Sequence, residues 1–149
     1  MHYFAYANLM DIDTMRSVAP SAQAVAIACL RNYKFSFARC TDPTKSGATL
    51  LPVDGAETWG VQYEMSDADM AALDRSAGIA EGNWAHMAVV VHDQQGVPHQ
   101  TTTYYIPNPS GTAGPPDHYV GPTLTGARKL SLPPAYLEGL TNLMTGKAA

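Results

Sequence analysis

Apolar and polar residues alternate along several stretches of the chain, as they do in strands with one buried face. Residues 33–39 and 57–65 show this alternation, and residues 3–6 form a short apolar run. Residues 84–93 have an apolar centre, and a Gln-Gln-Gly turn separates them from a second strand-like stretch at 97–106. We therefore predict strands in these stretches and a hairpin between the last two.

Signals for four short helices are found at residues 11–18, 66–77, 122–128 and 132–144. Ser66 is in the position of an N-cap, and Gly78 suits the left-handed residue that ends the same helix. Pro122 is expected near the first position of the third helix. Five to seven strands joined mainly by hairpins, with three or four helices, indicate an α+β (mixed α/β) fold, built as one domain over residues 1–149.

The composition of the 149 residues is that of an ordinary globular domain, with 46% hydrophobic and 15% charged residues. The net charge is −4 and no run of lysine or arginine is present, so we expect neither nucleic acid nor an anionic membrane as a partner. No apolar stretch approaches the roughly 20 residues of a membrane span, and the N-terminus lacks signal-peptide features. We expect a cytoplasmic protein that is a monomer or a homodimer.

Residues 3–11 combine a short strand, a turn of small residues and the start of a helix, an arrangement that often binds anions through backbone N–H groups. Ala7 and Asn8 are small enough to leave such N–H groups uncovered. Asp11 and Asp13 suit the first turn of the helix that follows. The turn is therefore a candidate binding site for a negatively charged oxygen.

The sequence of this turn resembles the Tyr-Gly-Ser-Asn loop of the gamma-glutamylcyclotransferase-like superfamily. Tyr6 matches the tyrosine, and Ala7, Asn8 and Leu9 occupy the positions of Gly, Ser and Asn. Later blocks resemble family segments in the same order: Trp-Gly-Val-Gln-Tyr at 59–63, Leu-Asp-Arg-Ser-Ala-Gly at 73–78, Gly-Asn-Trp-Ala-His at 82–86 and Leu-Pro-Pro-Ala-Tyr at 132–136. The resemblance implies a small β-barrel flanked by short helices, with a pocket at one barrel end.

Position 77 departs from the family at its catalytic residue. The resemblance places a glutamate there, and this chain has Ala77. In a gamma-glutamyl cyclotransferase the α-amine of the substrate attacks its own γ-carbonyl and forms 5-oxoproline, so a base must first deprotonate the ammonium group. Because a methyl group cannot carry protons, we expect the ordinary cyclotransferase reaction to be absent or very weak.

Three explanations of Ala77 stay open at this point. The chain is a cyclotransferase in which an original glutamate has been altered to alanine, or the fold acts on another small substrate, or it is a non-catalytic small-ligand binding protein. In the second case we expect cofactor-free amide or acyl chemistry, or proton transfer next to a carbonyl. The ligand in each case is a small molecule with a carboxylate or carbonyl group.

Two side chains are candidates to replace the missing base. Glu81 follows Ala77 by four residues, and His86 begins a predicted strand with the parity of Trp84. Tyr105 resembles the pocket tyrosine of the family on the partner strand.

The expected pocket residues come from the turn, from position 77 and from the hairpin strands. They are Tyr6, Ala7, Asn8, Leu9, Met10, Ala77, Trp84 and Tyr105. The five histidines lack the spacing of metal ligands, so neither a metal nor a cofactor is expected.

Overall fold

The computed structural model describes residues 1–146 and contains six strands in that range. They are β1 (His2–Ala5), β2 (Gln23–Arg39), β3 (Ser46–Glu64), β4 (Ala85–Asp93), β5 (Pro98–Tyr105) and β6 (Gly111–Thr112). The last three residues of the predicted 1–149 domain lie outside the described residues.

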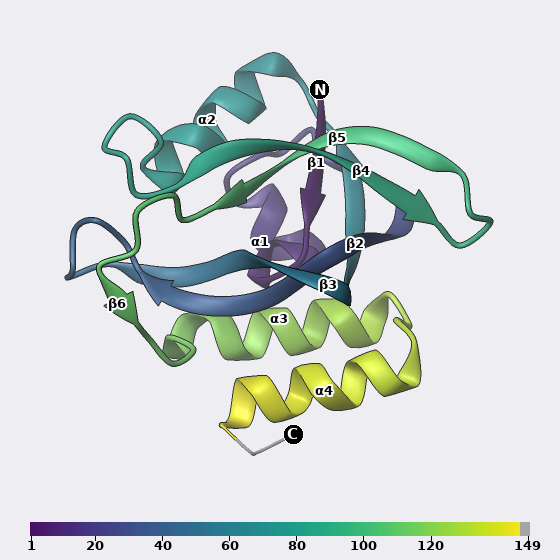
Figure 1. The fold of residues 1–149 in the computed structure, drawn as a ribbon. Coiled ribbons are helices and arrows are strands. Elements are labelled where there is room, and N and C mark those ends of the chain that lie inside the picture. The colour runs from purple at the N-terminus through teal and green to yellow at the C-terminus, as the bar shows by residue number, and fades with distance from the viewer. Residues whose placement is uncertain (147–149) are drawn as a thin grey trace.

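Five of these strands close into a barrel in the order β3-β1-β5-β4-β2, because β2 also pairs with β3. The strand pairs are antiparallel except β1–β5, and the short β6 is added beside the end of β2. Five strands and flanking helices confirm the predicted α+β fold with a small β-barrel (Figure 1).

The longest hairpin joins β2 to β3, and both strands are longer than their alternating sequence patterns predict. The pairing runs from Gln23–Glu64 to Arg39–Ser46 and contains two register shifts. One shift lies between Arg31 and Tyr33, where Asn32 has a positive φ of 67°. The first shift leaves Val25 unpaired, and the second leaves Asn32 on β2 and residues 53–56 on β3 unpaired. Both shifts break the period of two, so the sequence shows separate short strands where the structure has continuous ones.

The helices are η1 (Asn8–Met10), a short 3-10 helix, followed by α1 (Ile12–Arg16), α2 (Asp67–Ala77), α3 (Asp117–Lys129) and α4 (Pro134–Thr145). The caps of α2 confirm two predictions: the Ser66 hydroxyl accepts a hydrogen bond from the Asp69 N–H at 3.1 Å, and Gly78 is left-handed with φ 68°. In Figure 1, α3 and α4 lie side by side beneath the barrel.

The predicted start of the third helix was wrong. Helix α3 begins at Asp117, so Pro122 lies inside the helix and not at its first position. A proline there removes one N–H donor, whose partner in a regular helix would be the His118 carbonyl. Gly121 and Pro122 both disfavour a helix, so the sequence pattern does not predict the first turn of α3.

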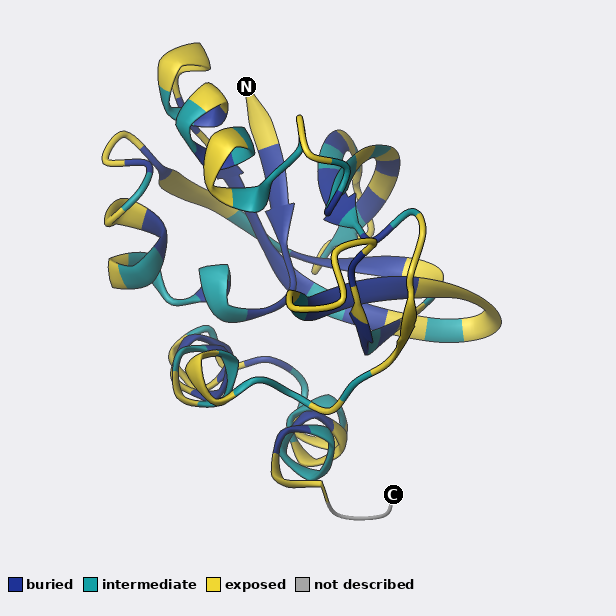
Figure 2. Ribbon diagram, turned by 90° about the vertical axis from the view of Figure 1, so that its left-hand side faces the viewer, coloured by how far each residue is buried: buried dark blue, intermediate teal, exposed yellow. Residues whose placement is uncertain are grey.

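The core fills the barrel and the space between the barrel and its helices. Figure 2 shows the buried segments following the strands, with exposed segments at loop tips and on outer helical turns. Two glycines permit close approaches to neighbouring backbone: a Cβ on Gly60 would lie 2.0 Å from the Ala5 carbonyl oxygen, and a Cβ on Gly126 would lie 2.5 Å from the Asp11 nitrogen. Gly60 thus lets β1 pair closely with β3, and Gly126 lets α3 pack against the turn after β1.

Candidate functional site

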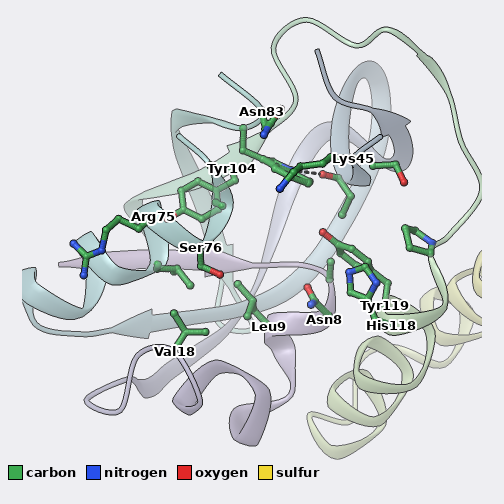
Figure 3. A pocket seen from close by; sticks show the side chains of 18 of the residues that line it. Asn8, Leu9, Val18, Lys45, Arg75, Ser76, Asn83, Tyr104, His118 and Tyr119 are labelled. Atoms are coloured by element: carbon green, nitrogen blue, oxygen red, sulfur yellow. Dashed lines mark hydrogen bonds between the residues drawn. The ribbon is translucent and has the colours of Figure 1, made fainter. Parts of the chain in front are cut away.

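A pocket of about 860 Å³ opens at one end of the barrel. The end of β1, the loop between β2 and β3, the end of α2, the end of β5 and the start of α3 all meet there. Figure 3 shows its side chains seen from close by. Segments far apart in the sequence therefore build one site, as the family resemblance implied.

The turn after β1 presents free donors on the wall of this pocket. The carbonyl oxygens of Ala7, Asn8 and Leu9 accept hydrogen bonds from the Met10 N–H, the Asp11 N–H and the Tyr63 hydroxyl, at 3.0, 3.2 and 2.9 Å. Within residues 1–146, the N–H groups of Ala7, Asn8 and Leu9 have no hydrogen-bond acceptor. With its carbonyls occupied and its N–H groups free, the turn attracts negatively charged or carbonyl oxygen.

Four tyrosines line the pocket: Tyr3, Tyr6, Tyr104 and Tyr119. Burial raises the pKa of each hydroxyl above its ordinary value of 10.0, to about 12 for Tyr119. The Tyr6 hydroxyl donates to the Tyr104 carbonyl at 2.8 Å. All four are therefore neutral near pH 7 and act as hydrogen-bonding groups of a weakly polar wall.

Tyr104 connects the pocket to a carboxylate on α2. Its hydroxyl donates to Asp74 Oδ1 at 2.5 Å, and His86 Nε2 lies 2.7 Å from the same oxygen. Because an ionised carboxylate only accepts, Nε2 of His86 must carry the hydrogen. The His86 ring also stacks on Tyr104, with ring centroids 5.6 Å apart, and its side chain is 44% exposed. A continuous hydrogen-bonded path thus joins a pocket tyrosine to a surface histidine.

Ala77 lines the pocket at the C-terminal end of α2, and Glu81 lines it from the loop that follows. Trp84 and Tyr119, which also line the pocket, pack over Gly47, where a Cβ would lie 2.6 and 2.4 Å from their side-chain atoms. The Trp84 indole N–H donates to the Ala48 carbonyl at 2.9 Å. Gly47 therefore lets two aromatic side chains form one wall.

Most of the residues expected at the site come together in the pocket. Those that line it are Tyr6, Ala7, Asn8, Leu9, Ala77, Glu81 and Trp84. Three others do not line it: Met10, which is buried beneath the turn, Tyr105, and His86, which reaches it only through Asp74 and Tyr104.

Among the polar residues at the site that sequence reasoning missed are Tyr104, Asp74 and Asn83. Tyr104 pairs with His86 across the hairpin and so points to the face opposite that of Tyr105. Strand alternation separates the two tyrosines but cannot say which face lines the pocket. The partner of Asp74 lies 30 residues away in sequence, so helix spacing does not predict this contact. No sequence signal pointed to Asn83.

Within residues 1–146, no group of three His, Cys, Asp or Glu side chains is arranged to hold a metal ion. In the same range no helix is long and apolar enough to cross a membrane.

The barrel, the end-on pocket and the turn with free N–H groups define a fold of the gamma-glutamylcyclotransferase type. A family model described as the AIG2-like family matches residues 57–140, and the chain belongs to that family. A comparison with curated proteins gave no match.

Solved structures agree with this assignment. A gamma-glutamyl cyclotransferase is 28% identical, with a TM-score of 0.88 over 94% of this chain and 85% of its own. An uncharacterized protein from Homo sapiens is also 28% identical, with a TM-score of 0.88 over 93% of this chain and 85% of its own. YkqA from Bacillus subtilis is 24% identical, with a TM-score of 0.81 over 99% of this chain and 56% of its own, and shows the fold alone.

Proposed function

We propose that this chain is a cofactor-free enzyme for a small substrate with a carboxylate or carbonyl group, in which Tyr104 and Asp74 move the protons that a glutamate at position 77 moves in related cyclotransferases. The single observation that carries the proposal is the 2.5 Å hydrogen bond between these two side chains, in the pocket that also contains the free N–H groups of the turn. Similarity to a gamma-glutamyl cyclotransferase supports amide or acyl chemistry for the same site.

Binding begins at the turn. The N–H groups of Ala7, Asn8 and Leu9 hold a substrate carboxylate, or the oxygen on which negative charge develops when a carbonyl is attacked. Backbone donors serve this purpose whatever side chains the turn carries, so its divergence from the family sequence leaves this step intact. The side chain of Leu9 and the methyl group of Ala77 make the pocket less polar, which favours a less polar substrate than a gamma-glutamyl compound.

Proton transfer uses Tyr104 as the group that touches the substrate. Its hydroxyl takes a proton from a substrate amine or from the carbon beside a carbonyl, and passes its own proton to Asp74 Oδ1, so that the tyrosine never carries a net charge. The electron pair left on the amine then attacks the carbonyl carbon, or the one left on carbon shifts toward the carbonyl. The proton returns from Asp74 through Tyr104 to the substrate atom that needs it, such as the nitrogen of the leaving amine. His86 acts as a positioning residue, because its N–H holds Oδ1 of Asp74 toward Tyr104.

The test is an activity screen of the native chain against small amides, gamma-glutamyl amides and lactones, followed by two substitutions. For any substrate that is turned over, we expect Asp74→Asn and Tyr104→Phe each to lower kcat about 100-fold or more, with a smaller effect on KM. His86→Gln keeps an N–H donor and should keep most of the activity, whereas His86→Leu should lose it. Full activity in Asp74→Asn would refute the role of the pair.

A second candidate function is a cyclotransferase without its base, which the position of Ala77 on the pocket wall favours. In that case the Ala77→Glu variant releases 5-oxoproline from gamma-glutamyl amides, and the native chain has no such activity. Binding of small carboxylates without turnover in either chain would indicate a binding protein. The cytoplasmic location and the choice between monomer and homodimer stay predictions.

A further inference from the structure

One part of the pocket is lined by aliphatic side chains. They come from the turn after β1, from the segment after α1 and from α2: Leu9, Val18, Leu73 and Ala77. Leu73 and Ala77 are four residues apart on α2, so they lie on the same face of that helix. Figure 3 shows Leu9 and Val18 in the same part of the pocket as Ser76, which precedes Ala77 on α2.

These aliphatic side chains are not fully covered. Leu9, Val18 and Ala77 pack against the hydrophobic core, but each stays half-buried and lines the pocket. Water next to such a surface is released when a hydrocarbon group covers it, which favours the binding of an apolar group. This part of the pocket is therefore suited to the hydrocarbon portion of a ligand.

Leu9 connects the aliphatic part of the pocket to the free N–H groups of the turn. Its own N–H is one of these free donors, and its carbonyl oxygen accepts a hydrogen bond from the Tyr63 hydroxyl at 2.9 Å. Because the N–H group and the side chain of one residue are only a few bonds apart, a ligand oxygen held by the turn lies close to the Leu9 side chain. The carbon atoms that follow this oxygen in the ligand then reach the aliphatic side chains.

The last two turns of α2 offer no free carboxylate to a cationic group of a ligand. Asp74 is their acidic residue, and its Oδ1 already accepts from Tyr104 and lies 2.7 Å from His86 Nε2. Position 77 has a methyl group, and Glu81 lines the pocket from the loop beyond the helix, where it is exposed. Placing an ammonium group against α2 without a carboxylate partner costs free energy, so this part of the pocket favours a hydrocarbon group over a charged amine.

We propose that the substrate carries an aliphatic group, which lies against Leu9, Val18 and Ala77 while the turn binds its carboxylate or carbonyl oxygen. This inference rests on the proposed function for the position of the oxygen. It names the substrate class as small aliphatic acyl compounds, such as amides and lactones with a branched hydrocarbon chain. These compounds differ from gamma-glutamyl amides, which carry an ammonium group.

The test compares two probes of equal shape, 5-methylhexanoate and 5-amino-5-oxopentanoate. The first ends in an isopropyl group and the second in a carboxamide, and both have the same carboxylate. Their dissociation constants are measured by NMR titration of the ¹⁵N-labelled chain. We expect the native chain to bind the hydrocarbon probe at least about tenfold more tightly, because the carboxamide loses hydrogen bonds to water when it meets an apolar surface.

Two substitutions within the aliphatic part test where the isopropyl group lies. Leu9→Asn and Val18→Thr change the polarity at nearly constant size, and each should lower the preference for the hydrocarbon probe at least about threefold. The matched controls Leu51→Asn and Val90→Thr make the same changes at exposed residues outside the pocket and should leave the preference unchanged. Because Val18→Thr preserves the shape of the side chain, it tests the inference even if Leu9→Asn disturbs the turn.

Three other outcomes would overturn the inference. Equal affinity for the two probes, or tighter binding of the amide probe, would show that the pocket does not prefer a hydrocarbon group, while the carboxylate site of the proposed function would stand. A hydrocarbon preference that survives both Leu9→Asn and Val18→Thr would place the isopropyl group elsewhere. If neither probe binds to the native chain, the proposed function fails together with the inference.

Discussion

At the scale of the residue, Tyr104 and Tyr105 show that a shift of one position along a strand determines whether a side chain lines the pocket. The two are neighbours with the same side chain, but Tyr104 lines the pocket and donates to Asp74, whereas Tyr105 does neither. The sequence places an aromatic hydroxyl at the end of this strand. Which of the two tyrosines faces the pocket depends on the register of β5 in the barrel, and this register cannot be predicted from the sequence alone. Asp74 was hidden for a related reason, since its contact is made by folding and not by helix spacing.

The hydrogen bond between Tyr104 and Asp74 should be measurable as stability. Tyr104→Phe removes the only donor that reaches the carboxylate from the pocket side within the described residues, and we expect a loss of about 1–2 kcal/mol in the free energy of unfolding near pH 7. Tyr105→Phe is the matched control and should change stability by less than about 0.5 kcal/mol. Urea unfolding of the three chains measures both values. Equal effects of the two substitutions would contradict this account of the pair.

At the scale of the element, the sequence predicted well where local signals are strong and poorly where packing overrides them. The alternating strands, the hairpin of β4 and β5 and both caps of α2 follow local rules. The long β2–β3 hairpin and the first turn of α3 do not, because register shifts and Pro122 break the local pattern. Pairing between β2 and β3 stabilises the hairpin, and the contact of Tyr119 with Phe37 on β2 holds the first turn of α3. Such contacts between distant residues produce no periodic pattern in a sequence.

The pairing of β1 with β3 depends on the absence of a side chain at Gly60. An added Cβ would meet the Ala5 carbonyl oxygen at 2.0 Å, so Gly60→Ala must push the strand that leads into the functional turn. We expect a loss of about 3 kcal/mol or more in the free energy of unfolding. Gly139→Ala is the control, since a Cβ there meets nothing within 4 Å on α4 and should stabilise the helix by about 0.5–1 kcal/mol. A tolerated Gly60→Ala would show that the strands are less tightly paired than described.

At the scale of the whole molecule, buried tyrosines tie stability to pH. Burial is the main cause that raises the pKa of Tyr3, Tyr6, Tyr63, Tyr104, Tyr119 and Tyr136 above the ordinary value of 10.0. A raised pKa in the folded state means that the neutral hydroxyl is favoured there, so this stability is complete below pH 10 and is lost as the pH rises above it.

We therefore expect the urea midpoint to fall steeply above about pH 10, together with a cooperative rise in tyrosinate absorbance. Absorbance and circular dichroism recorded on the same samples measure the two changes. Tyrosinate that forms in full while the native circular dichroism persists would contradict the burial of these hydroxyls.

An NMR titration tests most directly whether the turn after β1 binds a carboxylate through its free N–H groups, as we propose. The ¹⁵N-labelled native chain is titrated with 5-amino-5-oxopentanoate, and the amide signals of Ala7, Asn8 and Leu9 are followed. We expect these three signals to move downfield in ¹H along one saturable curve, because each N–H gains an acceptor that it lacks in the free chain. Saturable binding that leaves all three signals in place would contradict the claim and would assign the carboxylate to another part of the pocket.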